Sequence, residues 1–327
     1  MKTKFLIESI FIAAILLTAS FLTVVGYQSV QSNDKKSNTN SSSDDWYYLP
    51  AFPDYAPNGL PDFNQTQQDD WRDWGGKVNL CGAVSLADIL WWFDSKREHQ
   101  SGYAGDGNDS CSLVQDYHAL GSPVPGPNSD DHNYNNVNDN QTPYLRFKRT
   151  GELIERIAWY TNRQKDMKIL CKTLGSLTPF FYAFTLLCGI KKWLFDCHLQ
   201  KNFSVKPIFK PSFSTIITYL QNNAGIILGL SSVGNTLNNS SSSSYWGHFV
   251  AVAGINPLGY IAFSDPIQDK MNPSSDPYEH NNASIVSHDI WQVNFTSPDP
   301  TRSSSWWLPD YFGGALIIGA LIISEKS

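Results

Sequence analysis

The sequence predicts a mixed fold, in which a buried helix packs against antiparallel strands. The helix is expected from Cys81 to about Asp94, where apolar residues cover most of the helical circumference and no proline interrupts. A helix that is apolar on most sides lies inside a core. The strands are two apolar runs, 249–254 and 260–264, on either side of a turn at 256–259. Two short apolar runs joined by such a turn predict an antiparallel hairpin.

Further elements follow from shorter patterns. Residues 152–162 carry apolar side chains at helical spacing, and the apolar runs 226–230 and 315–324 are typical of buried strands. We also expect an irregular segment at 46–73 and a buried helix pair at 177–199. An extended linker is expected at 206–211, and a short helix at 214–222.

The composition is that of a folded protein with a large core. The chain has 327 residues, of which 13% are aromatic and 17% charged, and its net charge is −6 with no basic tract. A chain without a basic patch lacks the electrostatic footprint of nucleic-acid binding. We therefore expect no nucleic-acid partner.

The N-terminal stretch predicts export. Two lysines precede an apolar run at 10–26, which fits a cleaved signal peptide or an uncleaved membrane anchor over residues 1–27. The polar segment 28–45 is expected to be a disordered linker, and 46–327 to be one domain with a helical insertion around 150–200. We therefore expect a secreted or cell-surface protein, tethered to the membrane if the first segment is retained.

The chain has five cysteines, an odd number for an exported protein in which disulfides form. An odd count leaves one thiol unpaired. If Cys81 is that thiol, the other four can form two disulfides in any of three connectivities. The sequence does not choose among the pairings of Cys111, Cys171, Cys188 and Cys197.

Three residues supply the parts of a nucleophilic site. Cys81 is predicted at a helix N-terminus, where free N–H groups and the helix dipole favour the thiolate. His248 opens one strand of the hairpin and Asp265 follows the other, so strand pairing brings them to the same end. Thiolate chemistry needs a base and a group that orients it, which are roles for His248 and Asp265. The alternatives are a core cysteine with a structural histidine, or a zinc site made by the three side chains.

These motifs resemble a known family. The stretch CGAVSLA at 81–87, together with GHFVAVAG at 247–254 and SDP at 264–266, is similar to the papain-like cysteine peptidases of the C39-like group. The resemblance covers the core of the chain, about residues 74–94 and 213–266.

The resemblance implies an α+β, papain-like fold, in which the central helix carrying Cys81 packs on an antiparallel sheet. It also implies an exported cysteine hydrolase, a peptidase that acts on a peptide or protein substrate and needs no metal or organic cofactor. In this enzyme Cys81 attacks the substrate, His248 is the base and Asp265 orients the base.

One position departs from the family pattern. Papain-like enzymes carry a glutamine several residues before the cysteine as an oxyanion donor, and Gly75 stands at that position here. Asn79, with the Cys81 backbone N–H, is the candidate replacement. Loss of one such donor costs about 10²–10³ in rate. The alternative function is therefore a catalytically inactive surface module of the same fold that binds peptide or glycan.

Overall fold

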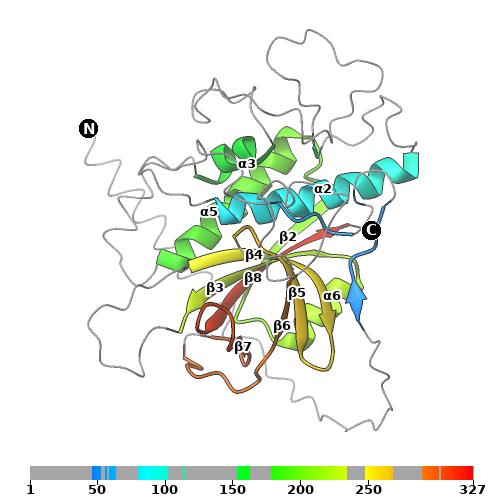
Figure 1. The fold of residues 1–327 in the computed structure, drawn as a ribbon. Helices are drawn as coiled ribbons and strands as arrows, with labels where there is room; N and C mark the ends of the chain where they lie inside the picture. The colour runs from blue at the N-terminus through cyan, green and yellow to red at the C-terminus, as the bar shows by residue number, and fades with distance from the viewer. Residues whose placement is uncertain are drawn as a thin grey trace, which may run out of the picture. The chain divides into compact units, whose positions relative to one another are not determined.

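The computed structural model describes residues 46–52, 56, 59–63, 80–101, 113–114, 153–162, 178–233, 247–267, 289–301 and 303–326 (Figure 1). The chain divides into two compact units, Met1–Asp44 and Asp45–Ser327, and every described residue belongs to the second. The predicted export segment and polar linker lie outside the described residues, so both stay predictions.

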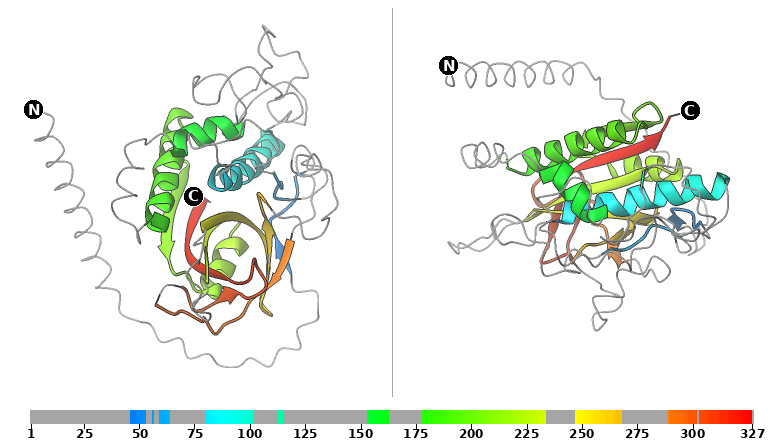
Figure 2. Two further views of the ribbon diagram at one scale, coloured as in Figure 1. Left: turned by 60° about the vertical axis from the view of Figure 1, so that its left-hand side comes forward. Right: turned by 90° about the horizontal axis from the view of Figure 1, so that it is seen from above.

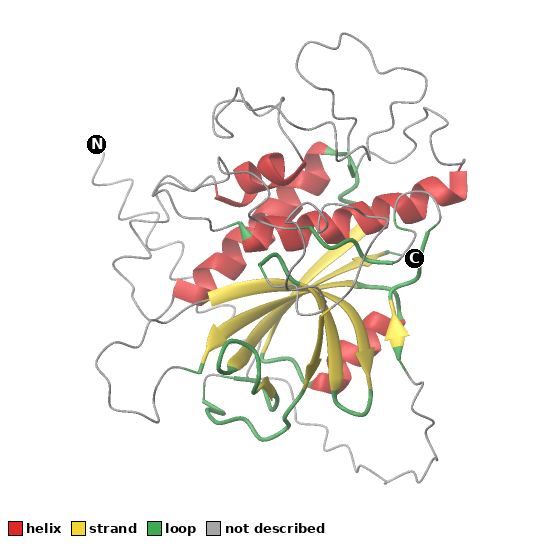
Figure 3. Cartoon of the chain, viewed as in Figure 1, coloured by secondary structure: helices red, strands yellow, loops and turns green. Residues whose placement is uncertain are grey.

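The described part of the chain is an α+β structure with one antiparallel sheet, which confirms the α+β class of the prediction; the papain-like fold stays a prediction (Figure 3). Its eight strands follow the order β2-β8-β3-β4-β5-β6, with β1 paired to β4 and β7 to β8. The strands are β1 (Tyr47–Tyr48), β2 (Phe203–Phe209), β3 (Gly225–Ser232), β4 (Gly247–Asn256), β5 (Tyr260–Ser264), β6 (Asp289–Gln292), β7 (Trp307–Leu308) and β8 (Ala315–Glu325).

Helices cover both faces of this sheet. In Figures 1 and 2, three of them gather on one side of the sheet and the fourth lies against the other. The first group is α2 (Cys81–Ser101), α3 (Leu153–Asn162) and α5 (Thr178–Asp196), and the fourth helix is α6 (Phe213–Gln221).

Helix α2 is the buried central helix that its apolar residues predict. Every side chain from 83 to 93 is at most 3% exposed. Aromatic contacts hold the helix on several sides, with the Trp92 ring 5.6 Å from that of Phe52, and the Phe93 ring 5.1 Å from that of Phe203 in β2. Burial on all sides explains why apolar residues cover most of the helical circumference along this stretch.

The predicted end of α2 at Asp94 is wrong, because the helix continues to Ser101. Two basic side chains on the extra turns, Lys96 and Arg97, form ion pairs with Glu325 of β8. The polar end of the helix is thus held by charge on the sheet rather than by apolar packing. The apolar pattern therefore stops earlier than the helix.

The predicted helix pair over 177–199 is also wrong, because one helix, α5, runs through most of this zone. In the sequence, Gly189 breaks the apolar run of this zone. In the structure, Gly189 instead allows a close crossing with α3. A Cβ at Gly189 would lie 2.7 Å from Thr161 Cγ2 and 3.0 Å from Thr161 Cα.

The linker predicted at 206–211 proves to be mostly strand, since β2 includes residues 203–209 and pairs with β8 along its length. Pro207 and the lysines beside it argue against a central strand. However, β2 lies at the edge of the sheet, where proline and lysine are tolerated because one side of the backbone needs no partner strand.

The predicted hairpin and C-terminal strand are confirmed. β4 and β5 pair around the turn at 256–259, the run 226–230 lies in β3, and 315–324 lies in β8. β8 lies inside the sheet, between the edge strand β2 and β3. β6 was not predicted, because its four residues include only two apolar ones, Ile290 and Trp291.

The thiol of Cys188 on α5 is free. The arrangement in which the four cysteines other than Cys81 form two disulfides is therefore not present. Cys111 and Cys171 lie outside the described residues. Among the helices that the structure describes, none has the length and apolar character needed to cross a membrane.

Gly225 of β3 faces α2 so closely that a side chain does not fit. A Cβ there would lie 2.3 Å from Ile89 Cγ2 and 3.1 Å from Phe93 Cε2. We expect Gly225→Ala to lower the free energy of unfolding by about 1–3 kcal/mol in urea denaturation, the usual cost of overpacking. Gly229→Ala on the same strand is the control, because its Cβ would have its nearest neighbour at 3.5 Å. Equal losses in the two variants would contradict this account.

Candidate active site

Cys81 is the first residue of α2, as predicted, and is 7% exposed. The hydrogen bond from Val84 N–H to the Leu80 carbonyl opens the helix, so the N–H groups of residues 81–83 have no partner within it. No acidic residue stands in the first turn to neutralise this positive end. The site of the thiol is therefore one that stabilises negative charge.

The start of α2 approaches the strand that carries His248. Gly82 permits this approach, since a Cβ there would lie 3.3 Å from Phe249 Cδ2. Cys81 lies close enough to the His248 side chain for its charge and hydrogen-bonding capacity to raise the pKa of the imidazole. The two residues thus meet from facing elements, α2 and β4, although 167 positions separate them in the numbering.

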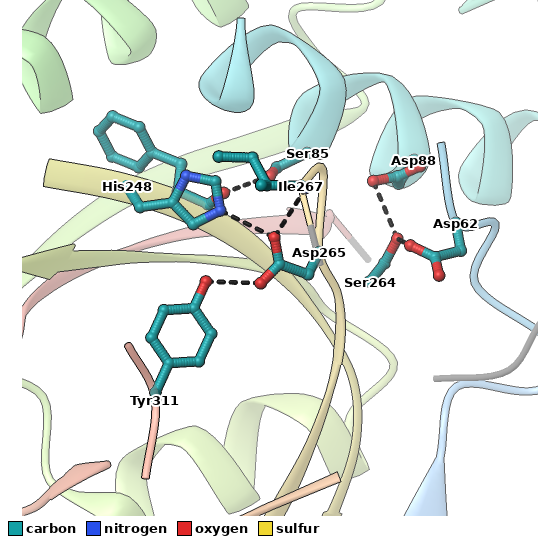
Figure 4. Close-up of polar contacts among 9 residues, drawn as sticks. Asp62, Ser85, Asp88, His248, Ser264, Asp265, Ile267 and Tyr311 are labelled. Carbon is teal, nitrogen blue, oxygen red and sulfur yellow. Dashed lines mark hydrogen bonds and ion pairs between the residues drawn. The ribbon is translucent and has the colours of Figure 1, made fainter. Parts of the chain in front are cut away.

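His248 and Asp265 lie together at one end of the hairpin, as its antiparallel pairing predicts (Figure 4). His248 Nε2 is 2.9 Å from Asp265 Oδ1, and the two residues are 5% and 0% exposed. With Nε2 directed at the carboxylate, Nδ1 is the ring nitrogen left for Cys81. This order of groups, thiol to imidazole to carboxylate, is the one that nucleophilic catalysis requires.

Two further groups fix the Asp265 carboxylate. The Tyr311 hydroxyl donates a hydrogen bond to Oδ2, and the Ile267 backbone N–H donates one to Oδ1 at 2.9 Å. The Tyr311 ring also stacks near the His248 ring, with their centroids 6.4 Å apart and their planes at 26°. Tyr311 is fully buried, so this phenol belongs to the site rather than to the surface.

The electrostatics of the site favour an imidazolium. Burial alone would lower the pKa of His248, but the negative charge of Cys81 and the hydrogen bonds with Asp265 and Cys81 raise it to about 10. Burial alone would raise the pKa of Asp265, but His248 and Tyr311 hold it below its usual range. A negative charge at Cys81 and a proton on His248 therefore attract each other.

A second group of buried acids lies beside this site (Figure 4). The Ser264 hydroxyl is 2.7 Å from Asp62 Oδ1 and 3.2 Å from Asp88 Oδ2, and the Phe63 N–H donates to Asp88 Oδ1 at 3.1 Å. Burial, followed by the charge of Asp88, raises the pKa of Asp62 well above its usual range. Burial likewise raises the pKa of Asp88.

The structure thus brings together Cys81, His248 and Asp265. Asn79, the candidate oxyanion donor, lies outside the described residues, as does Gly75. Sequence reasoning missed Tyr311, whose place depends on tertiary packing alone. It also missed the polar residues of α2, although their spacing from the cysteine was a usable signal.

Within the described residues, no group of three or more His, Cys, Asp or Glu side chains is arranged to hold a metal ion. No protein-family model matches the chain, and no curated protein matches it in sequence.

The coupling between the thiol and the imidazole can be measured directly. In Cys81→Ala the largest influence that raises the pKa of His248 is gone, so His248 should titrate about 1–3 pH units lower, the usual effect of removing a close opposite charge. NMR of the labelled imidazole ring reports this titration. Cys188→Ala, which removes a thiol elsewhere, is the control and should leave the His248 titration in place. An unchanged titration in Cys81→Ala would show that the thiol and imidazole are not coupled.

The Tyr311 hydroxyl should matter for stability in a pH-dependent way. A lowered folded-state pKa for Asp265 contributes stability above its ordinary value, and this contribution is lost as the pH falls through the folded-state pKa. Tyr311→Phe removes one hydrogen bond to the charged carboxylate, so it should cost about 1.5–3 kcal/mol above pH 5. The deficit should shrink in more acidic solution.

Urea unfolding between pH 3 and pH 7 measures this effect. Tyr219→Phe is the matched control, because the Tyr219 hydroxyl accepts its hydrogen bond from Lys206 on the surface. A Tyr311→Phe deficit that does not vary with pH would mean that the hydroxyl acts only through packing.

Proposed function

We propose that the protein is a cysteine hydrolase, a peptidase with a papain-like arrangement of nucleophile helix and sheet. One observation carries the proposal: the thiol at the N-terminus of α2 lies beside a histidine whose Nε2 is 2.9 Å from a buried carboxylate. The sequence resemblance supports the same reading. We further propose that it acts outside the cytoplasm, because of its predicted export segment.

In the proposed reaction, the Cys81 thiolate attacks the carbonyl carbon of a peptide bond and forms a tetrahedral intermediate. His248 then donates the proton on Nδ1 to the leaving amine, and the C–N bond breaks to give a thioester. His248 next takes a proton from water, which attacks the thioester and releases the carboxylic acid product. Asp265 keeps the imidazole oriented throughout and stabilises its charge.

The negative charge on the attacked oxygen needs hydrogen-bond donors. The backbone N–H of Cys81 is one candidate, because it stands at the start of α2 without a partner in the helix. Asn79 stays the proposed side-chain donor. A donor set without the usual glutamine would give an enzyme slower than its relatives in the family.

Two large apolar side chains beside the site suit a peptide substrate. Ile267 and Phe312 are 44% and 46% exposed, and each follows a buried site residue, Asp265 or Tyr311, within two positions. Exposed apolar side chains next to a reactive group favour binding of an apolar substrate residue. The same two side chains favour the alternative, a module that binds peptide without cleaving it.

Alkylation of the full-length protein by iodoacetamide from pH 4 to pH 9, mapped by mass spectrometry, tests the proposal. Cys81 should react well below pH 8, and His248→Ala should slow that reaction about 10²-fold or more, the lower end of what a positioned base contributes. Cys188 is an internal control, because burial raises the pKa of its thiol.

Hydrolysis is then tested with a peptide library. Cys81→Ala should abolish cleavage while the circular dichroism spectrum stays native. Cleavage by a pure Cys81→Ala sample would contradict the proposal. A Cys81 that reacts independently of His248 would favour the binding module instead.

A further inference from the structure

Helix α2 presents a polar line toward the hairpin on an otherwise apolar surface. Cys81, Ser85 and Asp88 are spaced four and then three residues apart, so they share one face of the helix. Between Gly82 and Phe93, Ser85 and Asp88 are the only polar residues. Both are 0% exposed, and a fully buried polar side chain is costly unless it is hydrogen-bonded.

Ser85 makes its hydrogen bond to the strand that carries the base. Its Oγ donates to the Phe249 carbonyl at 3.1 Å (Figure 4). Phe249 is the residue directly after His248. This bond therefore fixes α2 against β4. On the strand it lies one residue from His248, and on the helix it lies one turn after Cys81.

Asp88 makes the corresponding contact to the other strand of the hairpin. Its Oδ2 is 3.2 Å from the hydroxyl of Ser264, the residue directly before Asp265. Ser264 pairs with Ala251 in the hairpin, so both anchors act on one rigid unit. The face of α2 that carries the nucleophile is thus hydrogen-bonded beside each of its two partners.

The Asp62–Ser264–Asp88 contacts favour a proton on one of the acids. The Ser264 hydroxyl has one hydrogen, so it can donate to Asp62 or to Asp88 but not to both. A proton on one carboxyl would supply the hydrogen for the second, longer contact. The proton belongs to the pair rather than to one acid, as is usual for coupled carboxyls.

A shared proton also suits the neighbouring site. The titratable groups that face Asp62 are Asp88 on α2, Asp289 on β6 and Asp265 after β5, and His248 on β4 balances the charge of Asp265. Two more full charges beside Asp265 would oppose its ionisation. If Asp62 and Asp88 share one proton, their contacts with Ser264 bond the helix to the hairpin. The site then carries less negative charge than it would with both acids ionised.

We propose that Ser85 and the proton-bearing chain Asp62–Ser264–Asp88 are positioning groups, which set α2 on the hairpin so that the Cys81 thiol meets His248. This inference rests on the proposed function, since it concerns the geometry of the same site. None of the four residues touches the reacting atoms. Their effect is on how much of the thiolate–imidazolium pair forms near neutral pH.

The test is the rate of Cys81 alkylation by iodoacetamide at pH 6 and at pH 9. Ser264→Ala should slow alkylation at pH 6 about tenfold or more, because misplacement by 1 Å can cost 10²-fold. At pH 9 a thiol ionises without help, since an ordinary cysteine has a pKa of about 8.5, so the rates should converge there. A loss of general stability would not act at one pH alone.

Ser95→Ala is the matched control. Ser95 is also fully buried on α2, but its hydroxyl bonds only to the Trp91 carbonyl of the same helix. It should match the wild type at both pH values. If Ser264→Ala behaves like Ser95→Ala, the inference is overturned.

Two further variants keep the test decisive if Ser264→Ala does not fold. Ser85→Ala should show the same selective loss at pH 6, and equal rates would overturn the inference. Asp88→Asn, which keeps the shape and a hydrogen bond, should recover most of the rate that Asp88→Ala loses.

Infrared spectra test the shared proton. At pH 7 they should show a buried carboxylic acid band that the double variant Asp62→Asn with Asp88→Asn removes. Absence of this band in the wild type would overturn the shared proton.

The wild type separates this inference from the proposed function. If wild-type alkylation at pH 6 does not depend on His248, the proposed function fails and the positioning inference fails with it. If it depends on His248 but not on Ser264 or Ser85, the proposed function stands and only the positioning inference falls.

Discussion

The buried pair of His248 and Asp265 is the constraint on which the rest of the site depends. Charged groups at 5% and 0% exposure pay a large desolvation cost, which is offset only when hydrogen bonds and charges surround them on all sides. Here the hairpin supplies the pair itself, the loop before β8 supplies the Tyr311 hydroxyl, and α2 supplies a thiol at its positive end. Each of these elements must be in place for the pair to remain charged inside the protein.

Apolar burial and polar contacts have different roles in this arrangement. The apolar surface of α2 drives the helix onto the sheet, but hydrophobic packing is non-directional and does not by itself set the helix to within an ångström along its axis. Hydrogen bonds are directional. Ser85 and Asp88 place two of them on the nucleophile's own face, which ties the rotation and translation of the helix to the hairpin.

Much of this could be predicted from local patterns, and the failures have local causes too. The helix at Cys81, the hairpin and the meeting of His248 with Asp265 follow from periodicity and antiparallel pairing. The sequence does not show that Gly189 marks a helix crossing, because its close neighbour, Thr161, is set by tertiary packing. Pro207 argued against a strand because the sequence does not show which strands lie at an edge. Tyr311 has no signal near it, since it reaches Asp265 across 46 positions. Asp88 carried a signal, a polar residue at helical spacing from the cysteine, that the apolar reading of the helix passed over.

The place of β8 in the sheet has a consequence for synthesis. β8 follows every other described strand in the sequence, yet it lies between β2 and β3. While the ribosome is still adding these residues, β2 lacks its partner strand and β3 lacks one of its two, and the loop that carries Tyr311 has not emerged. The nucleophile and its base are made early, but the sheet that holds them closes only when this strand inserts. A nascent chain would therefore carry a thiol whose surroundings stay incomplete until β8 has been made and has paired.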